Sequence, residues 1–201
     1  MTDLVTDAIS GAGLKGQKAS AFLKDMLEAY PSDPAIGAPF DGRNTTYGVS
    51  SQFKRQAAIE TDLTFAEGYV EFLETFSART KTWGMIFEQP VVGIPAYGVA
   101  HGSDLVFYFP ELVGPKGDPR NRGWSEMMYA VHDAVINFVN FGDPNGCDDS
   151  AGYRWPDFSE SGLVTALNGT RIATAVPPPH RPGFDVIHKY LRPGPVVASD
   201  R

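Results

Sequence analysis

A histidine flanked by glycines has the best setting for acid–base chemistry in this chain. His101 lies in the stretch "AYGVAHGSDLVFYF", between Gly98 and Gly102. Glycine accepts sharp backbone corners that other residues resist, so the two glycines predict an open loop around the imidazole. Histidine is the side chain best suited to take up and release a proton near neutral pH. The pattern therefore makes His101 the candidate general base.

The three other histidines lack such a setting. His132 falls within a helical pattern, His188 falls within a shorter one near the C-terminus, and His180 lies among prolines. None of them has a nucleophile or a glycine-lined space beside it, so structural or solvent-exposed roles are expected. No histidines, cysteines or carboxylates show metal-ligand spacing on a common turn. The sequence therefore predicts no metal site and no cofactor.

A general base also needs a nucleophile to deprotonate. Hydrolytic serines commonly sit on a strained turn with the pattern G-x-S-x-G, and no serine of this chain has that spacing. The stretch "DDSAG" around Ser150 comes nearest, but Asp148 replaces the first glycine and no strand is expected before it. Cys147 is the single cysteine and lies in a polar loop without an adjacent base, so an unreactive thiol is expected.

Hydrophobic periodicity predicts the helices that must position His101. Apolar residues recur at helical spacing over 22–30, which ends at "YPSDP", and again over 66–76. Ser50 or Ser51 is expected to cap a helix through "QFKRQAAIE", and "FDVIHKYL" predicts a short terminal helix. The most regular helical pattern is in "GWSEMMYAVHDAVINFVNF", and its apolar stripe is expected to lie in the core. Its members are Trp124, Met127, Met128, Val131, Val135, Phe138 and Val139.

Two regions have the pattern of strands. In "KTWGMIFEQP", apolar residues alternate ahead of Pro90, and Ile86 between them indicates burial on both faces. The stretch "GLVTALNGTRIATAV" predicts two short strands joined by a hairpin turn at Asn168-Gly169. Because His101 follows the first strand within one loop, it matches the edge where open α/β sheets keep their chemistry.

Composition restricts the partners and the compartment. The 201 residues predict one domain over 1–201 without an internal boundary, and a net charge of −7 argues against nucleic-acid binding. No apolar run is long enough to span a bilayer. The start "MTDLVTDAIS" lacks signal-peptide features, which predicts a cytoplasmic chain. However, Asn44 in "NTT" and Asn168 in "NGT" are candidate N-glycosylation sites that suit secretion, so the compartment stays open.

Several stretches together resemble the type-B carboxylesterases, which include cholinesterases and fungal lipases. The motifs are "YPSDPAIGAPF", "SQFKRQAAIETDLTF", "GVAHGSDLVFYF", "FVNFGDPN" and "RWPDF", in the family's order over nearly the whole chain. The fungal members are the most similar. The resemblance implies an α/β fold, namely an incomplete, C-terminal part of an α/β-hydrolase with a mostly parallel sheet flanked by helices. It also implies that His101 is the histidine of a catalytic triad.

In that family, the serine elbow, the oxyanion loop and the triad acid precede the matching region, so the resemblance places them outside this sequence. Glu67-Gly68 has the family's acid–glycine pairing, but the helical pattern around it argues against the role. Asp104 stands where the family often has Glu, and we expect it to cap a helix. A histidine without a nucleophile cannot form an acyl-enzyme, so no activity is expected from this chain alone. Substrate-binding residues remain unassigned.

Three functional interpretations follow from the resemblance. In the first, the chain is an inactive C-terminal segment of an ester hydrolase, from an incomplete gene model, a truncated gene or a duplicated remnant. Alternatively, it assembles with a separate N-terminal half into an esterase for small-molecule esters. The third interpretation is a non-catalytic protein-interaction module on the esterase scaffold. A sheet separated from its neighbours would leave apolar surface uncovered, so self-association through that surface is also expected.

Overall fold

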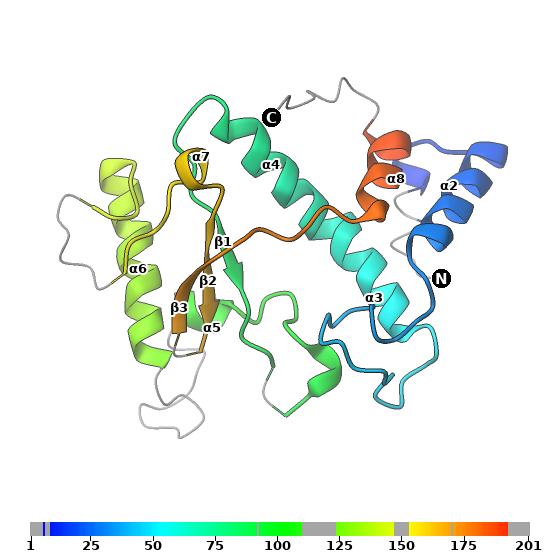
Figure 1. The fold of residues 1–201 in the computed structure, drawn as a ribbon, viewed down its shortest axis with the longest axis horizontal. Helices are drawn as coiled ribbons and strands as arrows, with labels where there is room; N and C mark the ends of the chain where they lie inside the picture. Colours follow the sequence, from blue (N-terminus) through cyan, green and yellow to red (C-terminus); the bar gives the residue numbers. More distant parts are fainter. Residues whose placement is uncertain are drawn as a thin grey trace. The chain divides into compact units, whose positions relative to one another are not determined.

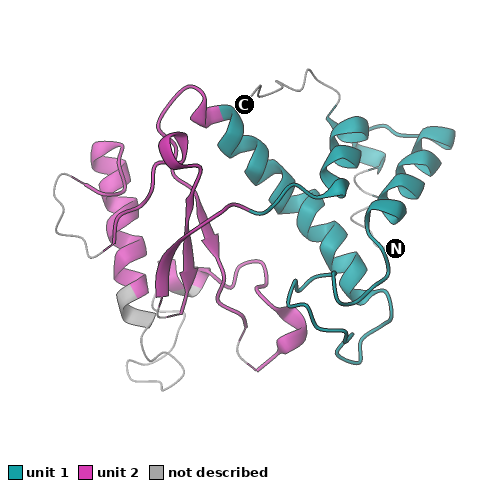
Figure 2. Cartoon of the chain, viewed as in Figure 1, with its two compact units in different colours: residues 1–75, 178–201 teal, residues 76–177 magenta. Residues whose placement is uncertain are grey.

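The chain divides into two compact units, which are coloured separately in Figure 2. One unit combines residues 1–75 with 178–201, and the other comprises residues 76–177. The computed structural model describes residues 6, 9–91, 93–109, 124–146, 153–169 and 171–192. The candidate residues Cys147 and Ser150 lie outside these ranges. The single-domain prediction stays a prediction.

The first unit is built from helices, which Figure 1 shows in blue, cyan and red. Helix α2 covers Gly16–Ala29 and helix α8 covers Pro182–Leu191. Between them in sequence, helix α3 (Phe53–Thr61), the π-helical turn η1 (Asp62–Ala66) and helix α4 (Glu67–Ser77) follow one another without a break. The end of α4 belongs to the second unit.

Helix α2 confirms the predicted apolar face and the predicted stop at Tyr30. Phe22 and Met26 are buried, and the Phe22 ring meets Tyr190 of α8 edge-on, with 5.5 Å between ring centroids. Asp25 on α2 accepts hydrogen bonds from Lys189 and from the Tyr190 hydroxyl, each at 2.8 Å. An apolar core and a small polar network therefore fix the α2–α8 pair.

The helix predicted after Ser50 and Ser51 begins differently from the expectation. Gln52 is the N-cap residue of α3, and it makes no side-chain capping bond. Ser50 instead uses its backbone carbonyl, which accepts a hydrogen bond from the Phe53 amide at 3.2 Å. The prediction of a serine side-chain cap was therefore wrong, because the backbone turn already satisfies the amide that a hydroxyl would have taken.

The second unit contains a three-stranded sheet in the order β1-β2-β3. Strand β1 (Met85–Phe87) is parallel to β2 (Val164–Asn168), which is antiparallel to β3 (Arg171–Ala175). The strand predictions are confirmed, although Ile86 is only half-buried. Asn168 is the last residue of β2 and pairs with Arg171, so Asn168 belongs to the strand and not to the predicted turn.

Helices α5 (Leu105–Tyr108) and α6 (Trp124–Phe141) supply much of the core of this unit. Met127 and Val131 of the predicted apolar stripe are buried there against Leu167 of β2. Val135, Phe138 and Val139 of the same stripe are exposed, and Val139 is 77% exposed. The prediction that the whole stripe is core is therefore wrong for its C-terminal half. The side chain of Trp124 lies outside the described part.

A polar clamp joins two motifs that carried the family resemblance. The side chain of Asn145 accepts a hydrogen bond from the Trp155 amide at 2.7 Å and donates to the Trp155 carbonyl at 3.1 Å. Asp143 in turn accepts from the side chain and the amide of Asn145, both at 2.8 Å. Asp157 caps the short helix α7 (Phe158–Ser161). The motifs "FVNFGDPN" and "RWPDF" thus hold one another in place.

These elements are compatible with part of an α/β-hydrolase, because helices accompany a small sheet with a parallel strand pair. None of the helices within the described ranges has both the length and the apolar character that a membrane crossing requires.

Replacing Gly183 with alanine should destabilise the first unit. A Cβ at this position would overlap the ring and hydroxyl of Tyr30, a buried residue at the end of α2. Such overpacking costs about 1–3 kcal/mol, which urea denaturation would measure. Gly11→Ala is the matched control, because a Cβ on Gly11 would meet no atom within 4 Å. Equal stability of the two variants would contradict this packing.

Candidate active site

His101 lies at a backbone corner that depends on glycine, as the sequence predicts. The short helix η2 (Pro95–Tyr97) precedes it and ends at Gly98, which has φ 54° and ψ −129°. Gly102 directly follows the histidine and has φ 77°. Residues other than glycine rarely adopt either backbone conformation, because their Cβ atom would clash with the backbone. The His101 side chain is exposed at this corner.

Backbone hydrogen bonds hold the loop on both sides of His101. The Val91 amide donates to the Gly98 carbonyl at 2.8 Å, which closes the segment before the histidine. After the histidine, the amide and hydroxyl of Ser103 donate to the Ala100 carbonyl at 3.1 and 2.6 Å. Ser103 is therefore a loop-stabilising serine, and its hydroxyl is already committed to the backbone.

Helix α5 anchors this loop to the core of the unit. Phe107 is buried and packs against Phe87 of β1, with 5.2 Å between ring centroids. Nε2 of His132 on α6 donates to the Tyr108 carbonyl at 3.0 Å, and the Tyr108 hydroxyl reaches the Met85 sulfur at 3.5 Å. A strand and a helix thus fix the segment that directly follows His101.

Asp104 does not act as the predicted side-chain cap. It is the N-cap residue of α5, but its side chain makes no capping bond, and only its carbonyl accepts from the Phe107 amide at 2.8 Å. Its backbone already has helical angles, with φ −78° and ψ −19°, whereas capping side chains usually need an extended backbone. The helical backbone at Asp104 explains why the sequence-based cap failed.

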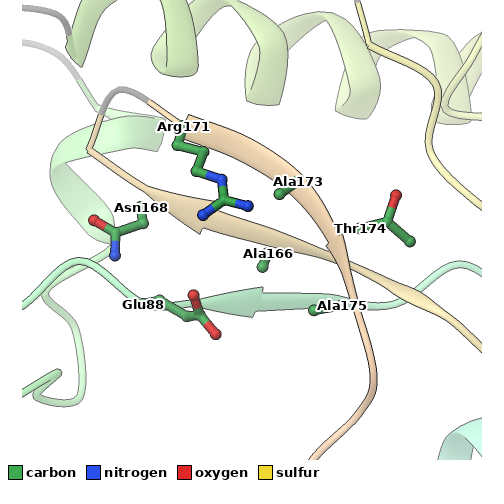
Figure 3. Close-up of a pocket in the computed structure, with 7 residues that line it drawn as sticks. All are labelled: Glu88, Ala166, Asn168, Arg171, Ala173, Thr174 and Ala175. Atoms are coloured by element: carbon green, nitrogen blue, oxygen red, sulfur yellow. The ribbon is translucent and has the colours of Figure 1, made fainter.

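A shallow hollow lies on the sheet of the same unit (Figure 3). Its volume is about 180 Å³, well below the volume typical of sites for drug-sized ligands. The lining residues are Glu88, Ala166, Asn168, Arg171, Ala173, Thr174 and Ala175. None of them is the candidate base or a serine, so this hollow does not form an active site with His101.

The first unit contains a cluster that sequence spacing did not reveal. Potential ligand atoms of Glu67, Glu71 and His188 lie within 4.8 Å of one another, because α8 brings His188 beside two carboxylates on α4. Arg192 contacts both carboxylates, at 2.9 Å for Glu67, and Nε2 of His188 lies 2.8 Å from Glu67. The positive charge of Arg192 occupies the place that a cation would need. The cluster is therefore an ion-pair network.

Glu67 is the member of this network whose charged form burial disfavours most clearly. Its side chain is fully buried, and neither oxygen makes a well-directed hydrogen bond. Burial raises the pKa of Glu67, while the nearby charges of Arg192 and His188 oppose that rise. His132 and His188 thus both have structural partners, as predicted, and His180 stacks edge-on against Phe184 at 5.1 Å.

Glu67→Gln should change how stability depends on pH. A raised pKa means that the native state binds this proton more tightly than the unfolded chain. The resulting stabilisation is present below the ordinary value of 4.5 and is lost as pH rises through the raised native pKa. Glutamine does not titrate, so the melting temperature of the variant should rise relative to wild type as the pH increases above the ordinary value of 4.5.

Thermal melts at several pH values would measure this difference, with Glu28→Gln as the control. Glu28 is an exposed carboxylate on α2. A difference between Glu67→Gln and wild type that shrinks towards neutral pH would contradict the assigned effect of burial.

Comparison with known proteins agrees with the sequence motifs. Residues 21–175, more than half of the chain, match the profile of the Carboxylesterase family. Secreted lipase 1 of Botryotinia fuckeliana (strain B05.10) is 32% identical over 153 residues, which cover 74% of this chain and 24% of that lipase. Lipase 4 of Diutina rugosa is 30% identical over 150 residues, covering 71% of this chain and 23% of the lipase.

Lipase 1 of Geotrichum candidum is 30% identical over 146 residues, which cover 73% of this chain and 23% of that protein. The chain therefore spans about a quarter of the length of the lipases that it matches. The match includes the His101 loop, the clamp at Asn145 and Trp155, and the whole sheet. On these grounds, the chain belongs to the carboxylesterase family.

Proposed function

We propose that this chain supplies the histidine base of a serine-dependent carboxylic ester hydrolase. The exposed position of His101, on a glycine corner between strand β1 and helix α5, carries the proposal. A base must reach a reacting group while its backbone stays fixed. The loop meets both requirements, because its ends are hydrogen-bonded and α5 is anchored through Phe107 and Tyr108.

In the proposed reaction, His101 accepts the proton of a serine hydroxyl as that oxygen attacks the ester carbonyl. The histidine then gives the proton to the departing alcohol, and the same cycle with water releases the acid. A carboxylate behind the imidazole would fix its tautomer. No serine in the 201 residues has the elbow spacing, so we place the nucleophile and the acid in other segments of a complete enzyme.

Glu67 is a poor candidate for that acid. It is buried in the ion-pair network of the first unit, where each of its carboxylate oxygens already lies beside His188 or Arg192. The relatives carry the name lipase, which supports acyl esters as the substrate class. We propose that the chain by itself is inactive and that it acts when an N-terminal part completes the enzyme.

His101→Asn should abolish most ester hydrolysis in a completed enzyme. The chain can be joined to the part of the Botryotinia lipase that precedes the matching region and assayed with p-nitrophenyl butyrate. General base catalysis is worth about 10²–10⁴ in rate, so a loss of that size is expected. His180→Asn, which changes an exposed histidine in the first unit, should retain the activity.

Two results would contradict the proposal. One is a completed enzyme that hydrolyses the ester equally well with and without His101. The other is covalent labelling of the unaccompanied chain by a fluorophosphonate at one serine, because this would place a working nucleophile within the 201 residues. The lipase rejoined to its own C-terminal part serves as the positive control for assembly.

A second candidate function, protein interaction, is supported by the exposed apolar side of α6. Tyr129, Ile136 and Val139 are all more than half exposed along this helix. Contiguous exposed apolar surface commonly marks a contact with another protein or with a further copy of the chain. We propose that this side of α6 promotes self-association of the chain when no other part covers it.

Val139→Lys should therefore reduce self-association and the binding of an apolar dye. Because Val139 is largely in water, its replacement should change the stability by no more than about 0.5 kcal/mol. Light scattering and dye fluorescence at several protein concentrations measure the effect. Val176→Lys is the matched control, since Val176 is an exposed valine of the same unit that is not part of α6. Equal effects of both lysines would contradict a role specific to α6.

A further inference from the structure

We propose that Asn44 is an N-glycosylation site that carries a glycan when the chain passes through a secretory pathway. Asn44, Thr45 and Thr46 form the Asn-x-Thr acceptor pattern. The side chain of Asn44 is exposed on the loop between α2 and α3. This inference is independent of the proposed hydrolase function.

The amide of Asn44 is available for modification. Within the described residues, no hydrogen bond or ion pair engages this side chain. Asn137 and Asn145 differ in this respect. The amide of Asn145 donates to Asp143 and Trp155, and the amide of Asn137 donates to the Pro144 carbonyl. A sugar on Asn145 or Asn137 would break structural contacts, whereas a sugar on Asn44 would break none.

The loop is anchored beside Asn44 by groups that a glycan would not disturb. Lys54 is a buried lysine whose Nζ donates to Asp41 at 2.7 Å and to the Arg43 carbonyl at 3.0 Å. On the other side, the Thr45 hydroxyl accepts from the Tyr47 amide at 3.1 Å. Burial of Lys54 requires these partners, so the loop keeps its shape while the Asn44 side chain extends into solvent.

A glycan at Asn44 would also cover apolar surface on its own loop. Phe40 and Val49 lie on either side of Asn44 in sequence, and both side chains are about half exposed or more. A hydrophilic oligosaccharide close to them would shield that surface from other proteins. The loop therefore has an accessible acceptor, and a glycan attached there would cover exposed apolar side chains of the same loop.

The second acceptor pattern has a different setting. Asn168 is exposed as well, but it closes strand β2 and pairs with Arg171 across the hairpin. Its side chain lies at the hollow beside Glu88 and Arg171 (Figure 3). A glycan there would be attached directly to the sheet. We therefore assign the modification to Asn44.

The chemistry is a glycosyl transfer with a lipid-linked oligosaccharide pyrophosphate as the donor. The amide nitrogen of Asn44 attacks C1 of the first sugar, and a C–N bond forms. The C–O bond between that sugar and the pyrophosphate breaks, and the lipid pyrophosphate leaves with the electron pair. The amide nitrogen loses one proton to a base of the transferring enzyme.

The full chain, secreted from yeast behind a cleavable leader, tests the proposal. Digestion after lysine releases the peptide 25–54 between Lys24 and Lys54, in which Asn44 is internal, as a glycan-releasing amidase requires. Enzymatic release should convert Asn44 to aspartate, and mass spectrometry detects this change. Because this measurement uses the unaltered chain, it does not depend on the folding of any variant.

Matched variants then identify the acceptor. Thr46→Ala removes the acceptor pattern and should abolish the glycan on peptide 25–54. Thr46→Ser keeps both the acceptor pattern and the hydrogen bond at the Thr45 hydroxyl, and it should retain the glycan. Asn168→Gln should leave peptide 25–54 unchanged. An unmodified Asn44 in the secreted chain would overturn the proposal, whether or not Asn168 is modified.

Discussion

The first unit depends on a buried carboxylate that must keep its cationic partner. Asp62 is fully buried in η1, and it accepts hydrogen bonds from Arg181 through Nε at 2.6 Å and through Nη2, and from the Tyr30 hydroxyl at 2.8 Å. Removing one partner of a buried ion pair typically costs about 3–5 kcal/mol. Since Arg181 follows the long excursion of the chain through the second unit, this ion pair ties the returning segment to the helices of the first.

The family motifs serve two separate purposes in this chain. Tyr30, Lys54 and Asp62 come from the motifs of the first unit, and all three are buried polar groups with specific partners. In the second unit, the Asn145–Trp155 clamp has the same locking role. The motif around His101 differs, because it leaves a titratable side chain exposed on a loop that is otherwise fixed. Most of the resemblance therefore reflects stability, and the His101 loop is the part for which we propose chemistry.

Periodicity and turn residues predicted the elements well, whereas side-chain partners escaped prediction. The α2 face, the strands and the glycine corner at His101 each depend on residues close in sequence, so the pattern contains the information. Asp62 and Arg181 are far apart in sequence, and no local signal links them. The prediction that the C-terminal half of α6 is buried failed for a related reason. A helical stripe shows which residues share a face, but it does not show whether another element covers that face.

The π-helical turn explains how one helical run buries two carboxylates. In a regular α-helix, residues five positions apart, such as Asp62 and Glu67, point about 140° away from one another. The wider turn of η1 rotates less per residue, so both carboxylates can face the packed side, where α8 and its flanks supply Arg181, His188 and Arg192. Asp62 accepts directed hydrogen bonds there, whereas Glu67 lies beside positively charged groups without accepting a directed hydrogen bond. The C-terminal segment is therefore held by two acids with different kinds of partner: directed hydrogen bonds fix Asp62, and ion pairs alone hold Glu67.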